Sequence, residues 1–234
     1  MKIEIIYRIN ALSGILAGAT AEVLSVGVDR TTARRRVVGK KWRQEPLLPG
    51  SSVKGKLRHE CERILTRLGQ KVCLAPRADL MCPNAERVPE QPCPACRLFG
   101  HPGRQVDDAS RLFFSDAIAD LDGSAARFAT RAQAGVSLSR RRRTAEDQRL
   151  YTIERGVEGL SYKGTISGYL RDETARRQAA LLIAALGSLV AVGGGKSRGA
   201  GWTKVEVTSV TLDGESLSAP QLEDLRREVS QWRV

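Results

Sequence analysis

The chain has 234 residues, of which 41% are hydrophobic, enough to build one large domain around a proper core. Its formal net charge is +12 and its pI is near 10.0, so a polyanionic partner is expected. The charge alone does not separate RNA from DNA or from an anionic lipid surface.

Three features bear on the compartment. Residues 1–6 place no charged region ahead of a long apolar run, so no secretory signal is expected. The apolar stretch 179–195 is short for a membrane span and ends in glycines, which predicts a buried helix and its exit loop. Five cysteines without a secretory signal then indicate a reducing cytoplasm, with metal ligands or free thiols rather than disulfides.

The first predicted elements are a strand and a basic loop. Residues 2–10 alternate apolar and polar side chains, as a half-buried strand does, and residues 14–27 predict a turn and a short extended segment. Residues 30–43 carry seven cations and no acidic residue, which is typical of a loop that orders on a polyanion; a merely solvated loop is the alternative. Within it, Trp42 could stack on a base or anchor the next strand. The candidate RNA contacts of this loop are Arg34, Arg35 and Arg36.

Residues 47–58 read as a strand end, a tight Pro-Gly turn and the start of a helix capped by Ser51 or Ser52. Apolar residues continue at helical spacing until Gly69, a suitable C-cap. The bare N–H groups and dipole of a helix N-terminus favour an anion such as phosphate. The cations that would accompany it are Lys54, Lys56 and Arg58. The alternative is an ordinary capped helix with a solvated basic face.

Four cysteines follow with the spacing C-x8-C-x10-C-x2-C, and they are Cys73, Cys82, Cys93 and Cys96. The final C-x2-C pair and the core-poor, proline-rich segment before it predict a structural zinc site with four thiolate ligands. Reduced structural cysteines are the alternative, and His101 could replace one ligand. Cys61 lies on the apolar side of the predicted helix and is expected to be a buried thiol.

The second half of the chain predicts a strand over residues 111–117 and then a long basic hairpin or loop over residues 131–154. Arg140 and Arg141 are its candidate RNA contacts. The remaining predicted elements are a strand over 160–170, a helix over 174–192, a glycine-rich loop over 193–201, a strand over 202–212 and a helix over 220–232. The loop follows a helix and lacks the first glycine of a P-loop, which makes a nucleotide P-loop a poor interpretation.

Residues 49–58, PGSSVKGKLR, resemble the signature of RAMP proteins, the RNA-binding subunits of CRISPR effector complexes. The resemblance is closest to the backbone subunits of type III complexes. Residues 96–100, CRLFG, which follow the cysteines, and residues 110–117 are similar to further segments of that group.

The order strand, helix, strand, strand, helix, strand predicts an α+β, ferredoxin-like fold. The resemblance implies the same, as a modified RNA-recognition fold. We expect one domain over residues 1–234, with insertions at 70–105 for the zinc module and 130–155 for a β-hairpin thumb.

The resemblance also implies a cytoplasmic ribonucleoprotein of antiviral defence. The chain would bind guide RNA through backbone contacts, pair it with target RNA, and assemble with other effector subunits, including copies of itself. Its glycine-rich loop would face RNA through Lys196, Ser197 and Arg198. Type III backbone subunits cut the target with a loop aspartate, which matches Asp29 here, in the presence of Mg²⁺ or Mn²⁺.

Three other interpretations stay open at this point. The chain could be a structural backbone subunit that does not cut, with Asp29 pairing to neighbouring arginines. It could be a repeat-processing RAMP endoribonuclease, although the cysteine module and the arginine-rich hairpin argue against this. It could also be a non-catalytic zinc-containing protein that binds DNA as well as RNA.

Overall fold

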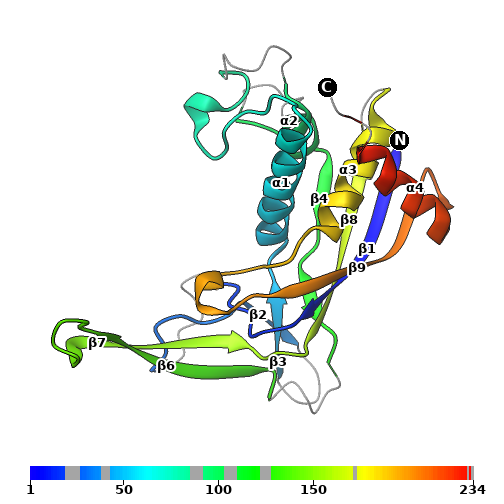
Figure 1. Ribbon diagram of the computed structural model, residues 1–234. Coiled ribbons are helices and arrows are strands. Elements are labelled where there is room, and N and C mark those ends of the chain that lie inside the picture. Colours follow the sequence, from blue (N-terminus) through cyan, green and yellow to red (C-terminus); the bar gives the residue numbers. More distant parts are fainter. Residues whose placement is uncertain are drawn as a thin grey trace.

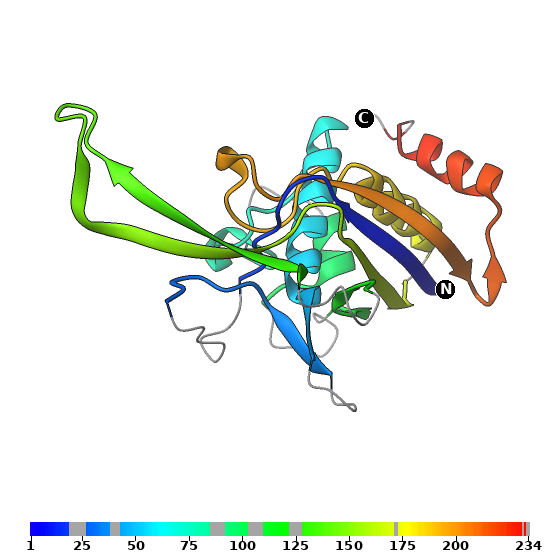
Figure 2. The ribbon, with the colours of Figure 1, turned by 90° about the horizontal axis from the view of Figure 1, so that it is seen from below.

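The computed structural model describes residues 1–18, 27–37, 43–84, 92–102, 110–121, 128–170, 173–230 and 232. Over this part of the chain it is an α+β protein, in which helices cover an antiparallel sheet of eight strands (Figure 1). The sheet has the order β10-β9-β1-β8-β5-β3-β2, and β4 also pairs with β8. A separate two-stranded ribbon, β6-β7, extends away from this body (Figure 2).

The strands and helices have the following bounds. The strands are β1 (Lys2–Ala11), β2 (Arg34–Val37), β3 (Arg43–Leu48), β4 (Leu112–Phe114), β5 (Ala117–Ala119), β6 (Thr130–Leu138), β7 (Ala145–Gly156), β8 (Ser161–Tyr169), β9 (Thr203–Leu212) and β10 (Glu215–Ser216). The helices are α1 (Gly50–Arg67), α2 (Pro94–Phe99), α3 (Ala175–Gly187) and α4 (Ala219–Ser230), with 3-10 turns η1 (Ala78–Leu80) and η4 (Lys196–Arg198).

Strand β1 is the centre of the sheet, because it pairs antiparallel with both β8 and β9. Its side chains at Ile3, Ile5, Tyr7 and Ile9 are fully buried, while their neighbours along the strand are exposed or half-buried. This confirms the half-buried strand that the alternating pattern predicts.

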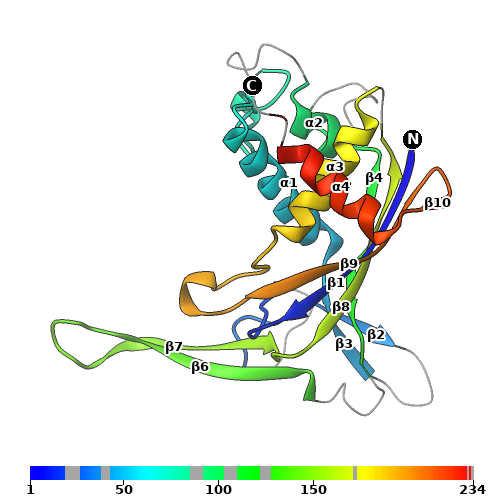
Figure 3. The same ribbon diagram turned by 45° about the vertical axis from the view of Figure 1, so that its right-hand side comes forward.

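Helices α1, α3 and α4 pack side by side against the core face of the sheet (Figure 3). Most of α3 is buried, which confirms that the apolar stretch forms a core helix, although α3 ends at Gly187 rather than at residue 192. Among the described residues, no helix is both long enough and apolar enough to cross a bilayer.

The start of α1 differs from the prediction. The helix begins at Gly50, with Pro49 at the N-cap, so Ser51 and Ser52 lie inside the first turn and neither caps it. The carboxylate of Asp116 instead accepts a hydrogen bond from the Gly50 N–H, at 2.8 Å. A β-carbon at position 50 would collide with the carbonyl oxygen of Phe114, so glycine allows β4 to approach the helix.

The single strand predicted over residues 111–117 is two short strands, β4 and β5, separated at Ser115 and Asp116. The interruption has a physical reason, since Asp116 turns toward the start of α1. Ser115 keeps the break tied to β8, because its N–H donates to the Thr165 carbonyl and its hydroxyl accepts from the Thr165 N–H.

The basic segment 30–43 is not a plain loop. Residues 34–37 form β2, which pairs with β3 as a hairpin at the edge of the sheet. Residues 38–42, including Trp42 and its predicted base stacking, lie outside the described residues. So does most of the extended segment predicted over 14–27, of which residues 19–26 are not described.

The sequence predicts a long basic hairpin or a loop over residues 131–154, and the structure has a hairpin there. Strands β6 and β7 pair along almost their whole length, and Arg140 and Arg141 lie in the turn between them. The root of the ribbon is bound to the body, because the Ile15 and Gly156 backbones exchange two hydrogen bonds.

Two glycines of α1 offer a matched test of this packing. We expect Gly50→Ala to lower the free energy of unfolding by about 1–3 kcal/mol, because helix and β4 backbone must move apart. Gly55→Ala is the control, since nothing lies within 4 Å of a β-carbon there. It should raise stability by up to about 1 kcal/mol through helix propensity. Urea unfolding of both variants measures this, and equal effects would contradict the close approach at Gly50.

Candidate metal centre and nucleic-acid interface

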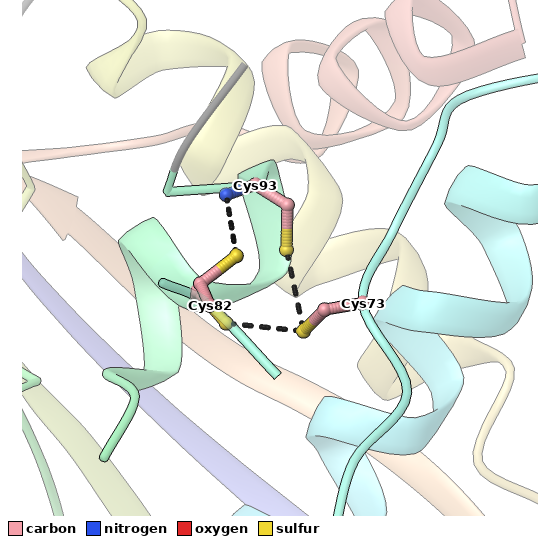
Figure 4. Close-up of side chains that lie close together, drawn as sticks. Cys73, Cys82 and Cys93 are labelled. Atoms are coloured by element: carbon pink, nitrogen blue, oxygen red, sulfur yellow. Dashed lines mark hydrogen bonds between the residues drawn. The ribbon is translucent and has the colours of Figure 1, made fainter. Parts of the chain in front are cut away.

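The four predicted cysteine ligands lie together in the interior. The sulfur atoms of Cys73, Cys82, Cys93 and Cys96 are all within 4.8 Å of one another, and all four residues are buried. The Sγ atoms of Cys73 and Cys96 are 3.4 Å apart, and those of Cys93 and Cys73 are 3.7 Å apart. Figure 4 shows Cys73, Cys82 and Cys93 with their side chains directed toward one another.

The local structure explains this convergence. Cys73 follows α1, Cys82 follows η1, and the C-x2-C pair places Cys93 at the N-cap of α2 and Cys96 inside its first turn. Hydrogen bonding with Cys96 lowers the pKa of the Cys93 thiol, which favours the thiolate form that binds a metal ion. In a tetrahedral site with Zn–S bonds near 2.3 Å, the sulfurs would be about 3.8 Å apart. The cluster therefore fits a structural metal ion of the zinc type.

His101, the alternative ligand, and Cys61, the expected buried thiol, do not belong to this cluster. Among the described residues, the group that could hold a metal consists of the four cysteines, without His101. Cys61 is fully buried on the core side of α1, as predicted, and burial raises the pKa of its thiol.

Arg58 lies against the cysteine cluster, a position that the sequence did not indicate. Its side chain is only 15% exposed, and its guanidinium is 3.1 Å from the Cys96 sulfur. The predicted contact between Arg58 and RNA gains no support from this placement and stays a prediction.

A second site lies where α1 meets the glycine-rich loop. Burial and the neighbouring ammonium of Lys196 lower the pKa of Lys56 to about 8. Lys196 belongs to the η4 turn, which is bounded by Gly195 and Gly199 in the left-handed conformation. Two ammonium groups held this close repel each other, and an anion bound between them would relieve the repulsion.

The other residues predicted around this helix start are arranged as follows. Lys54 lies over the ring of Phe114, 6.0 Å from its centre, and burial lowers its pKa. Ser51, Ser52 and Ser197 are exposed. The surface of Gly55 is open, because nothing lies within 4 Å of a β-carbon built there.

Asp29 lies at the root of the ribbon. Its carboxylate accepts a hydrogen bond of 2.6 Å from the Thr152 N–H, and its own N–H donates to the Thr152 carbonyl. It borders a cavity of about 330 Å³ that is also lined by Arg30, Tyr151, Ile153 and Arg198. The structure thus brings together two predicted residues, Asp29 and Arg198, that are far apart in the sequence.

The arginines of β2 differ in their surroundings. Arg34 is ion-paired with Glu154 of β7, and Arg35 is paired with the buried Glu45 at 2.7 Å. Arg36 is exposed on the same short strand. The first two arginines therefore hold the β2-β3 hairpin together and to the ribbon, whatever else they contact.

Sequence reasoning missed Arg155. Its guanidinium approaches Gly195 of the glycine-rich loop, and its Nε is buried without a hydrogen-bond partner among the described residues. It lines a cavity of about 290 Å³ together with Arg131 and Gln133 on the root of the ribbon. Arg155 directly follows the basic segment 131–154 in the sequence. No sequence pattern, however, indicates that it lies beside Gly195 in the fold.

A comparison with models of protein families identifies the family of this chain. The model of the RAMP superfamily matches residues 30–204, which include α1, the four cysteines, the ribbon and the glycine-rich loop. The chain therefore belongs to the RAMP superfamily, whose members are CRISPR-associated proteins that generally bind CRISPR RNA and other effector subunits. No curated protein matched the chain. Asp29 lies one residue before the matched range.

We expect the protein to carry one zinc per chain and to lose stability when a strong chelator removes it, because the thiolates are buried and close together. Cys93→Ser should remove most of the bound zinc. Cys61→Ala is the control, since Cys61 is equally buried but lies outside the cluster. Elemental analysis and thermal unfolding with and without chelator measure both effects. A zinc-free protein purified without chelator would contradict the assignment.

Proposed function

We propose that this RAMP protein is a backbone subunit of a type III CRISPR effector complex, which binds guide RNA and cuts the paired target RNA. The observation that carries the proposal is the cavity at the root of the ribbon. There a carboxylate, Asp29, lies beside cations of two separate segments, Arg30 and Arg198.

The topology supports the finer fold assignment. The order β1, α1, β4/β5, β8, α3, β9 corresponds to β-α-β-β-α-β, and the strands are arranged as β9-β1-β8-β5 in the sheet. We interpret the chain as one domain, residues 1–234, in which 70–105 is an inserted metal module and 130–155 an inserted thumb. The ribbon's separation from the main sheet and its arginine-rich tip support the thumb role.

The guide RNA would be held by its phosphates rather than its bases. Lys56 and Lys196 lie close enough to share a phosphate, and Gly55 leaves room for a backbone to approach α1. Specificity would then come from pairing between guide and target. The remaining proposed RNA contacts are Ser51, Ser52, Lys54, Ser197, Arg198, Arg36, Arg140 and Arg141. We add Arg155 to the proposal because its guanidinium approaches Gly195.

The pH dependence of RNA binding tests the paired lysines. The pKa of Lys56 is about 8 in the free protein, and a bound phosphate would raise it by favouring the ammonium. Binding should therefore be tight below pH 8 and weaken by up to about tenfold between pH 7 and 9, as the free protein loses this charge. Lys56→Arg should remove most of this pH dependence, because arginine stays charged.

Lys163→Arg is the control for that experiment, since Lys163 is an exposed lysine on β8, away from the glycine-rich loop in the sequence. It should keep the pH dependence of the unmutated protein. Fluorescence anisotropy with a labelled guide RNA at constant ionic strength measures the affinities. A flat pH profile for the unmutated protein would contradict a phosphate shared by Lys56 and Lys196.

Cleavage would proceed by internal attack within the target strand. The 2′-oxygen attacks its own phosphorus, the bond to the 5′-oxygen breaks, and the 2′ proton is lost while the leaving oxygen gains one. The products are a 2′,3′-cyclic phosphate and a 5′-hydroxyl. Asp29 would orient the 2′-hydroxyl or accept its proton, and Arg30 and Arg198 would offset the developing charge on the phosphate.

A divalent ion at Asp29 would need further ligands from the bound RNA. Among the described residues, the cavity offers one carboxylate, whereas Mg²⁺ prefers six oxygen ligands and commonly binds through one or two carboxylates, phosphates and water. A requirement for Mg²⁺ or Mn²⁺ is therefore proposed only for the RNA-bound complex.

We expect Asp29→Asn to abolish cutting at this subunit's position while leaving target binding nearly unchanged. The amide oxygen of asparagine can still accept from the Thr152 N–H, so the root of the ribbon is preserved while the charge is lost. Asp29→Ala should also abolish cutting but additionally loosen the root. The assay is an assembled complex with end-labelled matched RNA and Mg²⁺ or Mn²⁺.

Asp213→Asn is the matched control, because the Asp213 carboxylate likewise accepts a backbone N–H, from Lys2, in another part of the fold. It should cut normally. Undiminished cutting by Asp29→Asn would remove Asp29 from the mechanism.

A non-cutting backbone subunit is the second candidate. The hydrogen bond between Asp29 and Thr152 favours it, since this contact gives the carboxylate a structural role in holding the ribbon. Absence of any cut at this position in the unmutated complex would support this second candidate.

A further inference from the structure

Arg58 has all three of its guanidinium nitrogens engaged inside the protein. Its Nε donates to Glu62 at 2.9 Å, its Nη1 to the Gly100 carbonyl at 2.8 Å, and its Nη2 to the Cys96 sulfur at 3.1 Å. The same Nη2 lies 3.9 Å from the sulfur of Cys73. The planar fork of arginine is suited to three directional bonds at once, which a lysine ammonium on one flexible stem is not.

The cysteine cluster that Arg58 contacts would carry buried negative charge when a metal ion is bound. Four thiolates around one divalent ion carry a net charge of −2, and all four cysteines are buried at 2% exposure or less. Burying uncompensated charge is costly unless hydrogen bonds offset it. An N–H group donated by a cation to a thiolate is a charge-assisted hydrogen bond of the kind that does so.

We propose that Arg58 is a positioning residue of the metal centre, which holds the Cys96 and Cys73 thiolates in place for the metal and disperses their charge. Its outer contact with Glu62 fixes the guanidinium plane, and its contact with Gly100 fixes the chain just after α2. The proposal rests on metal binding by the four cysteines and is independent of RNA binding or cleavage.

The proposal also connects two parts of the fold. Arg58 lies one turn after Lys54 on α1, whereas Cys96 and Gly100 belong to α2 and the residue that follows it. Loading the metal would therefore reinforce the packing of α1 on the cysteine module through this side chain.

Cobalt(II) and zinc binding to the full-length, reduced chain test the proposal. Arg58→Met keeps the length of the side chain but removes every donor, and Arg58→Lys keeps the charge but not the fork. Both should bind zinc at least about tenfold more weakly in competition with a chromogenic chelator, as is typical when an outer-shell partner of a metal site is lost. The sulfur-to-cobalt charge-transfer band should shift to longer wavelength, because the thiolate regains electron density.

Arg63→Met is the control, because Arg63 lies on the same helix and pairs with Glu60 rather than with the cluster. It should match the unmutated protein in both measurements. Circular dichroism checks that each variant folds. If Arg58→Met does not fold, the Arg58→Lys variant alone tests the proposal. Unchanged zinc affinity together with an unchanged cobalt band in the folded Arg58 variant would overturn the proposal, as would an unmutated protein that binds neither metal.

Discussion

The position of α1 depends on a carboxylate that lies 66 residues away in the sequence. Asp116 accepts the first N–H of the helix, and Gly50 allows the β4 backbone to touch its first turn. The helix carries Lys56 toward the glycine-rich loop, Arg58 toward the cysteines and its apolar side toward the sheet. A shift at this one junction would displace the metal centre and the cationic site together.

The net charge of +12 is only partly available to an outside partner. Arg34 and Arg35 are paired with acidic residues, and Arg58 is directed into the protein against two sulfurs. Other cations are exposed, among them Arg198 of the glycine-rich loop and Arg140 and Arg141 at the tip of the ribbon. The positions of the exposed cations are therefore more informative about where RNA could bind than the net charge is.

The sequence predicted those features that depend on neighbours in the chain. The alternation of β1, the core side of α1 and the C-x2-C knuckle are local patterns, and each appears in the structure as expected. The features it missed depend on partners brought together by folding. Serine is a common helix cap, so the sequence favoured Ser51 or Ser52, but the tertiary contact from Asp116 displaced that preference. Arg58 and Arg155 were unpredictable for the same reason, because nothing local indicates a sulfur or a glycine loop as their neighbour.

The ribbon projects from the body of the protein and is anchored at its root. Within the described part of the chain, its strands pair only with each other beyond the root, where Asp29 and Arg34 connect it to the rest of the protein. A strand such as β6, with nine residues, is roughly 30 Å long at about 3.3 Å per residue. A tilt of roughly 10° at the root would then move the tip by about 5 Å, more than the roughly 3.4 Å between successive stacked bases. If the ribbon contacts RNA as proposed, the few contacts at its root would determine which nucleotide step its tip reaches.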